Sequence, residues 1–104
     1  MDKRIDQNIR KFVSTVAEKN PRFEKAFLFG SYARNQARPD SDIDLALFID
    51  NLEDDEKFDL QVQLILLASQ FDSRIEPHPL SNAEFNFGNP FITEIRKTGI
   101  EIKP

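Results

Sequence analysis

The stretch from Gly30 to Leu45 constrains the fold of this 104-residue chain more than any other segment. Before it, residues 25–29 form a nearly continuous apolar run that Gly30 ends, which is typical of a strand buried on both faces. Between residues 42 and 49 an aliphatic side chain occupies every second position, which predicts a second strand. The segment 31–37 has few strand formers and is expected to form a short helix, which Pro39 closes.

Helices and further strands are predicted on both sides of this stretch. Apolar residues at helical spacing predict an amphipathic helix that ends at Asn20-Pro21, and a second helix from about residue 57 to residue 70, after an acidic loop over residues 50–56. The residues expected on the inner face of the second helix are Phe58, Val62, Ile65 and Leu66, with Ser69 as a further candidate. Residues 74–80 predict a third strand with a free edge, because Pro77 and Pro79 lack the N–H donor that a ladder needs.

The end of the chain completes an α/β (α+β) pattern. Residues 81–84 resemble a capping box, residues 90–98 can form a last helix with Gly99 as its C-cap, and residues 100–102 alternate as a short strand. Strands and helices therefore interleave, and we expect one domain over residues 1–104, because this length supports a single core.

Composition excludes several classes of protein. The chain carries 14 Lys and Arg against 18 Asp and Glu, so direct binding to nucleic acid is not expected. It has no Cys, its N-terminus lacks the apolar run of a secretory signal, and no apolar stretch approaches the roughly 20 residues that cross a bilayer. We therefore expect a cytoplasmic protein without a membrane span.

Two carboxylates and a glycine turn are the candidate site. On a strand, Asp42 and Asp44 point to the same face about 7 Å apart. Such a pair suits Mg²⁺, which prefers one or two carboxylates together with phosphate oxygens and water, although a solvated strand end is the alternative. Gly30 and Ser31 can present N–H groups and a hydroxyl to a phosphate or form an ordinary turn, and the Gly-Lys-Ser/Thr ending of a P-loop is absent.

Several other side chains have two possible roles. Arg34 either neutralises phosphate charge or is solvated, and for Arg38 we favour the solvated role. On a strand, His78 would share the face of Glu76, where it would contact nucleotide or acceptor or be a partly buried polar residue. For the phenylalanines between residues 85 and 91, packing against the sheet is favoured over a partner surface.

The pattern of Gly30-Ser31, ten intervening residues and Asp42-Ile43-Asp44 resembles the signature of the minimal nucleotidyltransferases of the DNA polymerase beta superfamily. The resemblance extends over nearly the whole chain, including the opening helix, the strand before Gly30 and the closing residues 91–102. It implies the nucleotidyltransferase fold, a small mixed sheet flanked by helices. Family members of this size are commonly paired with a HEPN-domain partner in toxin–antitoxin systems.

The resemblance also implies roles for individual residues. It implies that Asp42 and Asp44 hold two Mg²⁺ ions, that Gly30 and Ser31 bind the triphosphate of ATP, and that a third carboxylate lies on a neighbouring strand. Glu76 is the best candidate for this third ligand, and it would help to deprotonate the acceptor hydroxyl. The chain departs from the commonest pattern here, because the third acid is often Asp.

The function expected from the resemblance is transfer of AMP from ATP to a hydroxyl, most plausibly a tyrosine of a cognate HEPN toxin, which would make the chain an antitoxin. One alternative is an antitoxin that neutralises its toxin by binding alone. Another is nucleotidyl transfer to a small molecule or to an RNA end, which the missing accessory domains and the acidic charge weaken.

Overall fold

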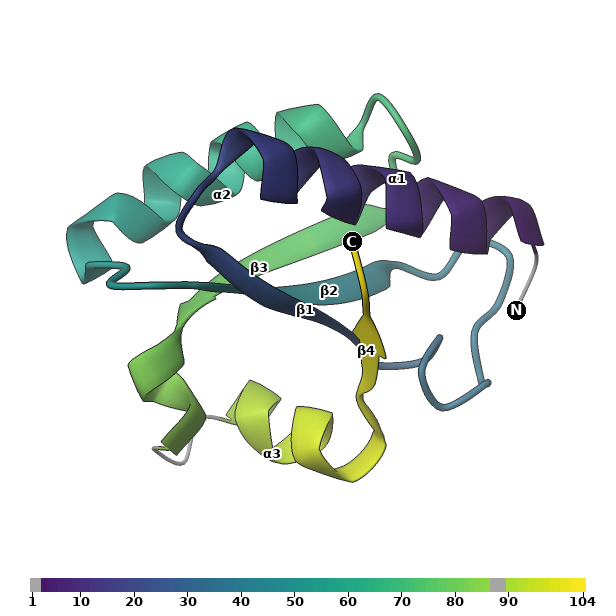
Figure 1. Ribbon diagram of the computed structural model, residues 1–104. Coiled ribbons are helices and arrows are strands. Elements are labelled where there is room, and N and C mark those ends of the chain that lie inside the picture. Colours follow the sequence, from purple (N-terminus) through teal and green to yellow (C-terminus); the bar gives the residue numbers. More distant parts are fainter. Residues whose placement is uncertain (1–2, 87–89) are drawn as a thin grey trace.

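The structure, a computed structural model, describes residues 3–86 and 90–104 (Figure 1). Its elements follow in the order α1 (Lys3–Lys19), β1 (Phe23–Phe29), β2 (Ile43–Ile49), α2 (Asp54–Ala68), β3 (Ile75–Ser81), the 3-10 helix η1 (Asn82–Asn86), α3 (Pro90–Thr98) and β4 (Ile100–Ile102). The predicted interleaving of strands and helices is confirmed. Within the described ranges, no helix is long and apolar enough to cross a membrane.

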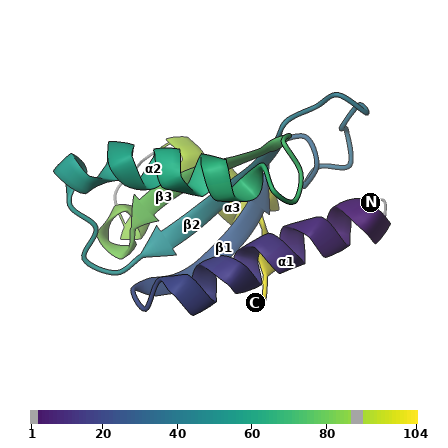
Figure 2. The same cartoon turned by 90° about the horizontal axis from the view of Figure 1, so that it is seen from above.

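The four strands form one mixed sheet in the order β3-β2-β1-β4. Strand β1 pairs antiparallel with β2 and β4, whereas β2 and β3 run parallel. Helices α1 and α2 lie on one face of the sheet and α3 on the other (Figure 1), and α1 and α2 lie side by side when seen from above (Figure 2).

Strand β3 is an edge strand, as its prolines predicted. The carbonyl of Pro77 accepts a hydrogen bond of 3.2 Å from the Nε2 group of Gln61 on α2. The outer side of β3 is therefore partly closed, because Pro77 and Pro79 have no N–H to offer there and α2 occupies one of its carbonyls.

The alternation along β2 divides the core into two layers. Ile43, Leu45 and Leu47 face α1 and α2, where they pack with Ile9 and Phe12. The opposite face of the sheet packs against α3 and η1 through Phe29, Ala46, Phe48, Leu80, Ile92 and Ile95. Successive β2 residues thus serve opposite sides of the sheet, so the even-numbered aspartates belong to the face that α3 covers.

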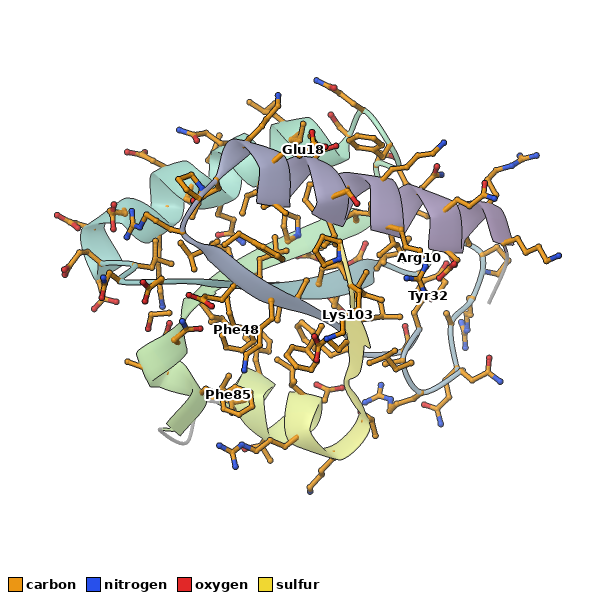
Figure 3. All side chains as sticks on the ribbon, viewed as in Figure 1. Arg10, Glu18, Tyr32, Phe48, Phe85 and Lys103 are labelled. Atoms are coloured by element: carbon orange, nitrogen blue, oxygen red, sulfur yellow. The ribbon has the colours of Figure 1, made fainter. Side chains whose placement is uncertain are left out.

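The phenylalanines near the end of the chain pack on this second face. The rings of Phe48 and Phe85 meet edge to face with centroids 5.5 Å apart, in the space between the sheet and α3 (Figure 3). Phe91 packs on Phe29 at 5.4 Å. The predicted packing role is confirmed for these two residues, and Phe87 lies outside the described residues.

The predicted helix over residues 31–37 is wrong, because the structure has successive turns there. The N–H of Arg34 donates to the Gly30 carbonyl and that of Gln36 to the Ser31 carbonyl, so a first helical turn begins. Asn35 then adopts a φ of 56°, in the left-handed region, where a right-handed helix cannot continue.

The predicted inner face of α2 is also wrong, and the helix starts at Asp54, inside the predicted acidic loop. Leu64 and Ala68 are buried and Leu60 and Leu67 partly buried, whereas the four apolar residues expected inside are exposed, as is Ser69. Apolar side chains occur on two sides of this helix, so periodicity alone fits either side. The side of α2 that carries Leu64 and the small residue Ala68 packs on the sheet.

The orientation of α2 predicts a large effect for one leucine of this helix and a small effect for another. Leu64→Ala should lower the free energy of unfolding by about 2–4 kcal/mol, because it opens a cavity under the helix. Leu66→Ala should change it by less than about 0.5 kcal/mol, because that side chain is 64% exposed. Urea denaturation of both variants measures the difference, and equal losses would contradict the orientation of α2.

Candidate active site

The parallel register of β2 and β3 brings the candidate carboxylates together. Asp44 lies opposite Glu76, and Ala46 lies opposite His78. Alternate residues of a strand share a face, so Asp44, Glu76 and His78 all lie on the side of the sheet that α3 covers. Asp42 immediately precedes β2, and its carboxyl group lies close enough to Glu76 to raise the pKa of Glu76. Glu76 is therefore near both aspartates.

The geometry of this cluster suits a cation. Asp44, Glu76 and His78 each offer one ligand atom, and these three atoms lie within 4.8 Å of one another. The Nε2 atom of His78 lies 3.3 Å from Oδ1 of Asp44. No other group of three or more potential metal ligands occurs in the described part of the chain. Asp42 is outside this group of three, but its carboxyl group raises the pKa of Glu76.

Partial burial and neighbouring negative charge both disfavour the ionised form of Glu76. Desolvation by partial burial raises the pKa of Glu76 above its ordinary value of 4.5, and the hydrogen bond and negative charge of Asp42 raise it further. The charge of Asp44 adds to the rise in pKa, whereas His78 opposes it. A divalent cation relieves such repulsion, so this set of oxygen ligands fits Mg²⁺.

Gly30 is adjacent to the cluster because Phe29, the last residue of β1, pairs with Asp44. Gly30 has a φ of 76°, and a Cβ atom at this position would lie 2.5 Å from Oδ2 of Asp44. The missing side chain thus makes room for a carboxylate, in addition to allowing the turn. Ser31 follows directly in this turn, so the predicted phosphate-binding residues and Asp44 lie together.

His78 is held by two aromatic rings. Its ring centroid lies 5.5 Å from that of Phe29 and 5.0 Å from that of Phe91. Its side chain is only 16% exposed, which leaves its Nε2 atom directed at Asp44. From the sequence, His78 is expected on the face of Glu76 but not among the metal ligands. Predicting His78 as a ligand would have required the β2–β3 register, which a single sequence does not reveal.

The two arginines of the turn lie in different surroundings. Arg34 forms a partly exposed ion pair of 2.8 Å with Glu94 of α3, on the carboxylate side of the sheet. Arg38 lines a cavity of about 470 Å³ together with Tyr32, Arg74 and residues of α1. This cavity is on the α1 side of the turn, so the structure does not bring Arg38 to the carboxylates.

Residues 11–103 match the protein family described as Polymerase beta, Nucleotidyltransferase. No curated protein is significantly similar to the chain. A candidate nucleotidyltransferase from Sulfolobus solfataricus is similar in structure, with 23% identity and a TM-score of 0.67 over 94% of this chain and 78% of that one.

Two further similar structures are toxin–antitoxin complexes. One contains AMP-PNP, and its matching chain has 21% identity and a TM-score of 0.62 over 94% of this chain and 72% of that one. The other is a tri-AMPylated Shewanella oneidensis HEPN toxin with its MNT antitoxin, with 21% identity and a TM-score of 0.60 over 93% and 70% of the two chains. At such identities the likeness shows a shared fold, so the predicted nucleotidyltransferase fold is confirmed.

The raised pKa of Glu76 predicts a pH-dependent effect of Glu76→Gln in metal-free buffer. The stabilising contribution of Glu76 is complete below its unfolded pKa and is lost as pH rises through the raised folded value. Glutamine keeps a neutral side chain throughout, so the variant should melt at a higher temperature than wild type at pH 7. At about pH 4 the gap should shrink. Thermal melts with EDTA measure this, and lower stability of the variant at pH 7 would contradict it.

The contact of Gly30 with Asp44 predicts that Gly30→Ala costs more than about 1 kcal/mol of folding free energy, because both φ and the Asp44 carboxylate oppose a Cβ atom. Ser31→Ala changes the next residue of the same turn without that strain, and should cost less than about 0.5 kcal/mol. Chemical denaturation compares the two variants. Equal stability of Gly30→Ala and wild type would show that the turn and Asp44 can separate freely.

Proposed function

Because the chain belongs to the polymerase beta nucleotidyltransferase family, we propose that it transfers AMP from ATP to the hydroxyl of a tyrosine in a cognate HEPN toxin. The transfer would inactivate the toxin, which makes the chain an antitoxin. The observation that carries the proposal is the convergence of Asp42, Asp44 and Glu76 beside the Gly30 turn. A binding-only antitoxin would have no use for three mutually repelling carboxylates.

Asp42, Asp44 and Glu76 are the residues that would hold two Mg²⁺ ions, with His78 as a further donor beside Asp44. When bound, the metal would neutralise phosphate charge and polarise the attacking and leaving oxygens. The same carboxylates would keep ATP away without a cation, because like charges repel. Metal and nucleotide binding should therefore depend on each other.

The chain's own groups would orient the nucleotide. Gly30 and Ser31 offer backbone N–H groups in the turn that directly follows β1. The guanidinium of Arg34 is partly exposed in its pair with Glu94, and such exposed pairs contribute only about 0–1 kcal/mol. A triphosphate can thus replace Glu94 as the partner of Arg34, because it offers more charge and bidentate acceptors.

In the transfer, the acceptor oxygen would attack the α-phosphorus of ATP as the bond to pyrophosphate breaks. Glu76 is the group beside the cluster that would help to remove the hydroxyl proton. The products are a tyrosine bearing AMP and free pyrophosphate. Glu76 itself is exposed to solvent, which leaves room for the hydroxyl of a protein acceptor. We propose that the reaction takes place in the cytoplasm.

The similar structures support this acceptor. One of them holds a HEPN toxin that carries three AMP groups in complex with an MNT antitoxin, and another contains the ATP analogue AMP-PNP. The AMP groups and the AMP-PNP belong to the related proteins. For this chain they indicate which nucleotide and which class of acceptor to test first.

We expect a mass increase of one or more AMP units when the purified HEPN-domain protein encoded beside this chain is incubated with it, ATP and Mg²⁺. Asp42→Ala and Asp44→Ala should lower the rate at least about 100-fold, because each removes a charged group at the reacting centre. Asp40→Ala removes an exposed carboxylate two residues from Asp42 and should leave the rate within about twofold. Intact-mass spectrometry of the partner measures all of these rates.

Two results would overturn the assignment. Inhibition of the partner without a mass change would show an antitoxin that acts by binding alone. Release of pyrophosphate that requires an added small-molecule hydroxyl compound, with the partner unmodified, would indicate that the acceptor is a small molecule. Circular dichroism of the aspartate variants would exclude misfolding as the cause of lost activity.

A further inference from the structure

Helix α2 exposes a contiguous row of large apolar side chains. Phe58 is 73% exposed and Leu66 is 64% exposed, and between them Val62 and Ile65 are 41% and 44% exposed. Positions separated by four, seven and eight residues lie on one side of a helix, so these four side chains form one continuous surface, the apolar stripe. Single exposed apolar residues are ordinary, but a contiguous patch marks a contact surface.

The apolar stripe is not needed for the fold. The opposite side of α2 already packs on the sheet through Leu64 and Ala68. The neighbouring edge of the sheet is a poor alternative for docking, because Pro77 and Pro79 lack N–H donors and Gln61 occupies the Pro77 carbonyl. A partner that approaches this side of the molecule therefore meets the surface of the helix.

The charges around the apolar stripe define the chemistry of its partner. Asp54, Asp55 and Asp59 are exposed at the first two turns of α2. The Lys57 ammonium is engaged with Glu84 at 2.6 Å, and the last turn of α2 has no basic residue. The rim of the stripe is thus acidic. A second copy of the chain would bring the same acidic rim and a net charge of −4, which disfavours self-association.

We propose that the apolar stripe of α2 is the docking surface for an amphipathic helix of the acceptor protein, with apolar side chains flanked by Lys and Arg. This inference rests on the proposed function, because it identifies how the chain holds its acceptor. Four side chains cannot fill a stable interface of about 800 Å² per partner. They form its apolar centre, and the acidic residues form the rim that selects a basic partner.

The position of α2 fits this role. The helix packs on β3, the edge strand that carries Glu76, and residues 69–74 connect the two elements directly. The C-terminal end of the stripe therefore lies at the end of the molecule where β3 begins. Helix α2 covers the sheet face opposite to α3 (Figure 1). A partner held on α2 therefore does not cover the face that carries Asp44 and Glu76.

The test is the affinity of the full chain for the same HEPN-domain protein, measured by biolayer interferometry without ATP. Phe58→Gln with Leu66→Gln should weaken binding at least about tenfold, because both side chains lie in the apolar centre. Ile100→Gln is the matched control, since Ile100 is 47% exposed on β4 at the opposite edge of the sheet. Asp55→Lys with Asp59→Lys should also weaken binding, whereas Glu18→Lys on α1 should not.

The outcomes separate this inference from the proposed function. Unchanged binding by the Phe58 and Leu66 double variant, an equal loss in Ile100→Gln, or no binding by wild type would overturn the docking surface. A wild-type dimer in sedimentation velocity that this double variant abolishes would assign the stripe to a second copy and overturn it too. Asp44→Ala should bind the partner like wild type. Normal docking without any AMP transfer by wild type would instead refute the proposed function alone.

Discussion

The hydrogen-bonded register between β2 and β3 is the constraint on which the rest of the structure depends. It places Glu76 beside Asp44, and the pairing of β1 with β2 places Gly30 against the same carboxylate. A shift of one residue in β3 would turn Glu76 and His78 into the α2 side of the core. The apolar residues that alternate with them prevent that shift, because Ile75, Pro77 and Pro79 are buried. Packing of the core therefore fixes the geometry of the candidate site.

Sequence patterns were sufficient to predict the features that depend on a local rule. The structure confirms the strand predicted from the alternation after Asp42 and the edge position predicted from the prolines of β3. It also contains reciprocal hydrogen bonds between Ser81 and Glu84, as a capping box requires. Each depends on residues close together in the chain. Asn35 marks the point where the expected helix over residues 31–37 fails, because its φ of 56° ends the helical turn, and Asn tolerates this left-handed conformation.

The errors have a common physical origin. Helix α2 carries apolar residues on two sides, and only its packing on the sheet decides which side is buried. The place of His78 next to Asp44 likewise depends on pairing between two strands that are separated by a helix. Both facts involve contacts between distant parts of the chain. The error on α2 was informative, because the side chains wrongly expected in the core form the apolar stripe, which has no role in the packing of the core.

Pro77 and Pro79 have a consequence that lies outside both chemistry and docking. An open strand edge is a template on which strands of other molecules can add, and newly made chains are most exposed to this hazard. In this protein the strand at risk also carries Glu76. Two missing N–H groups make that edge a poor template for a further strand. The prolines thus allow a functional carboxylate to remain at the rim of the sheet without turning the strand into a seed for aggregation.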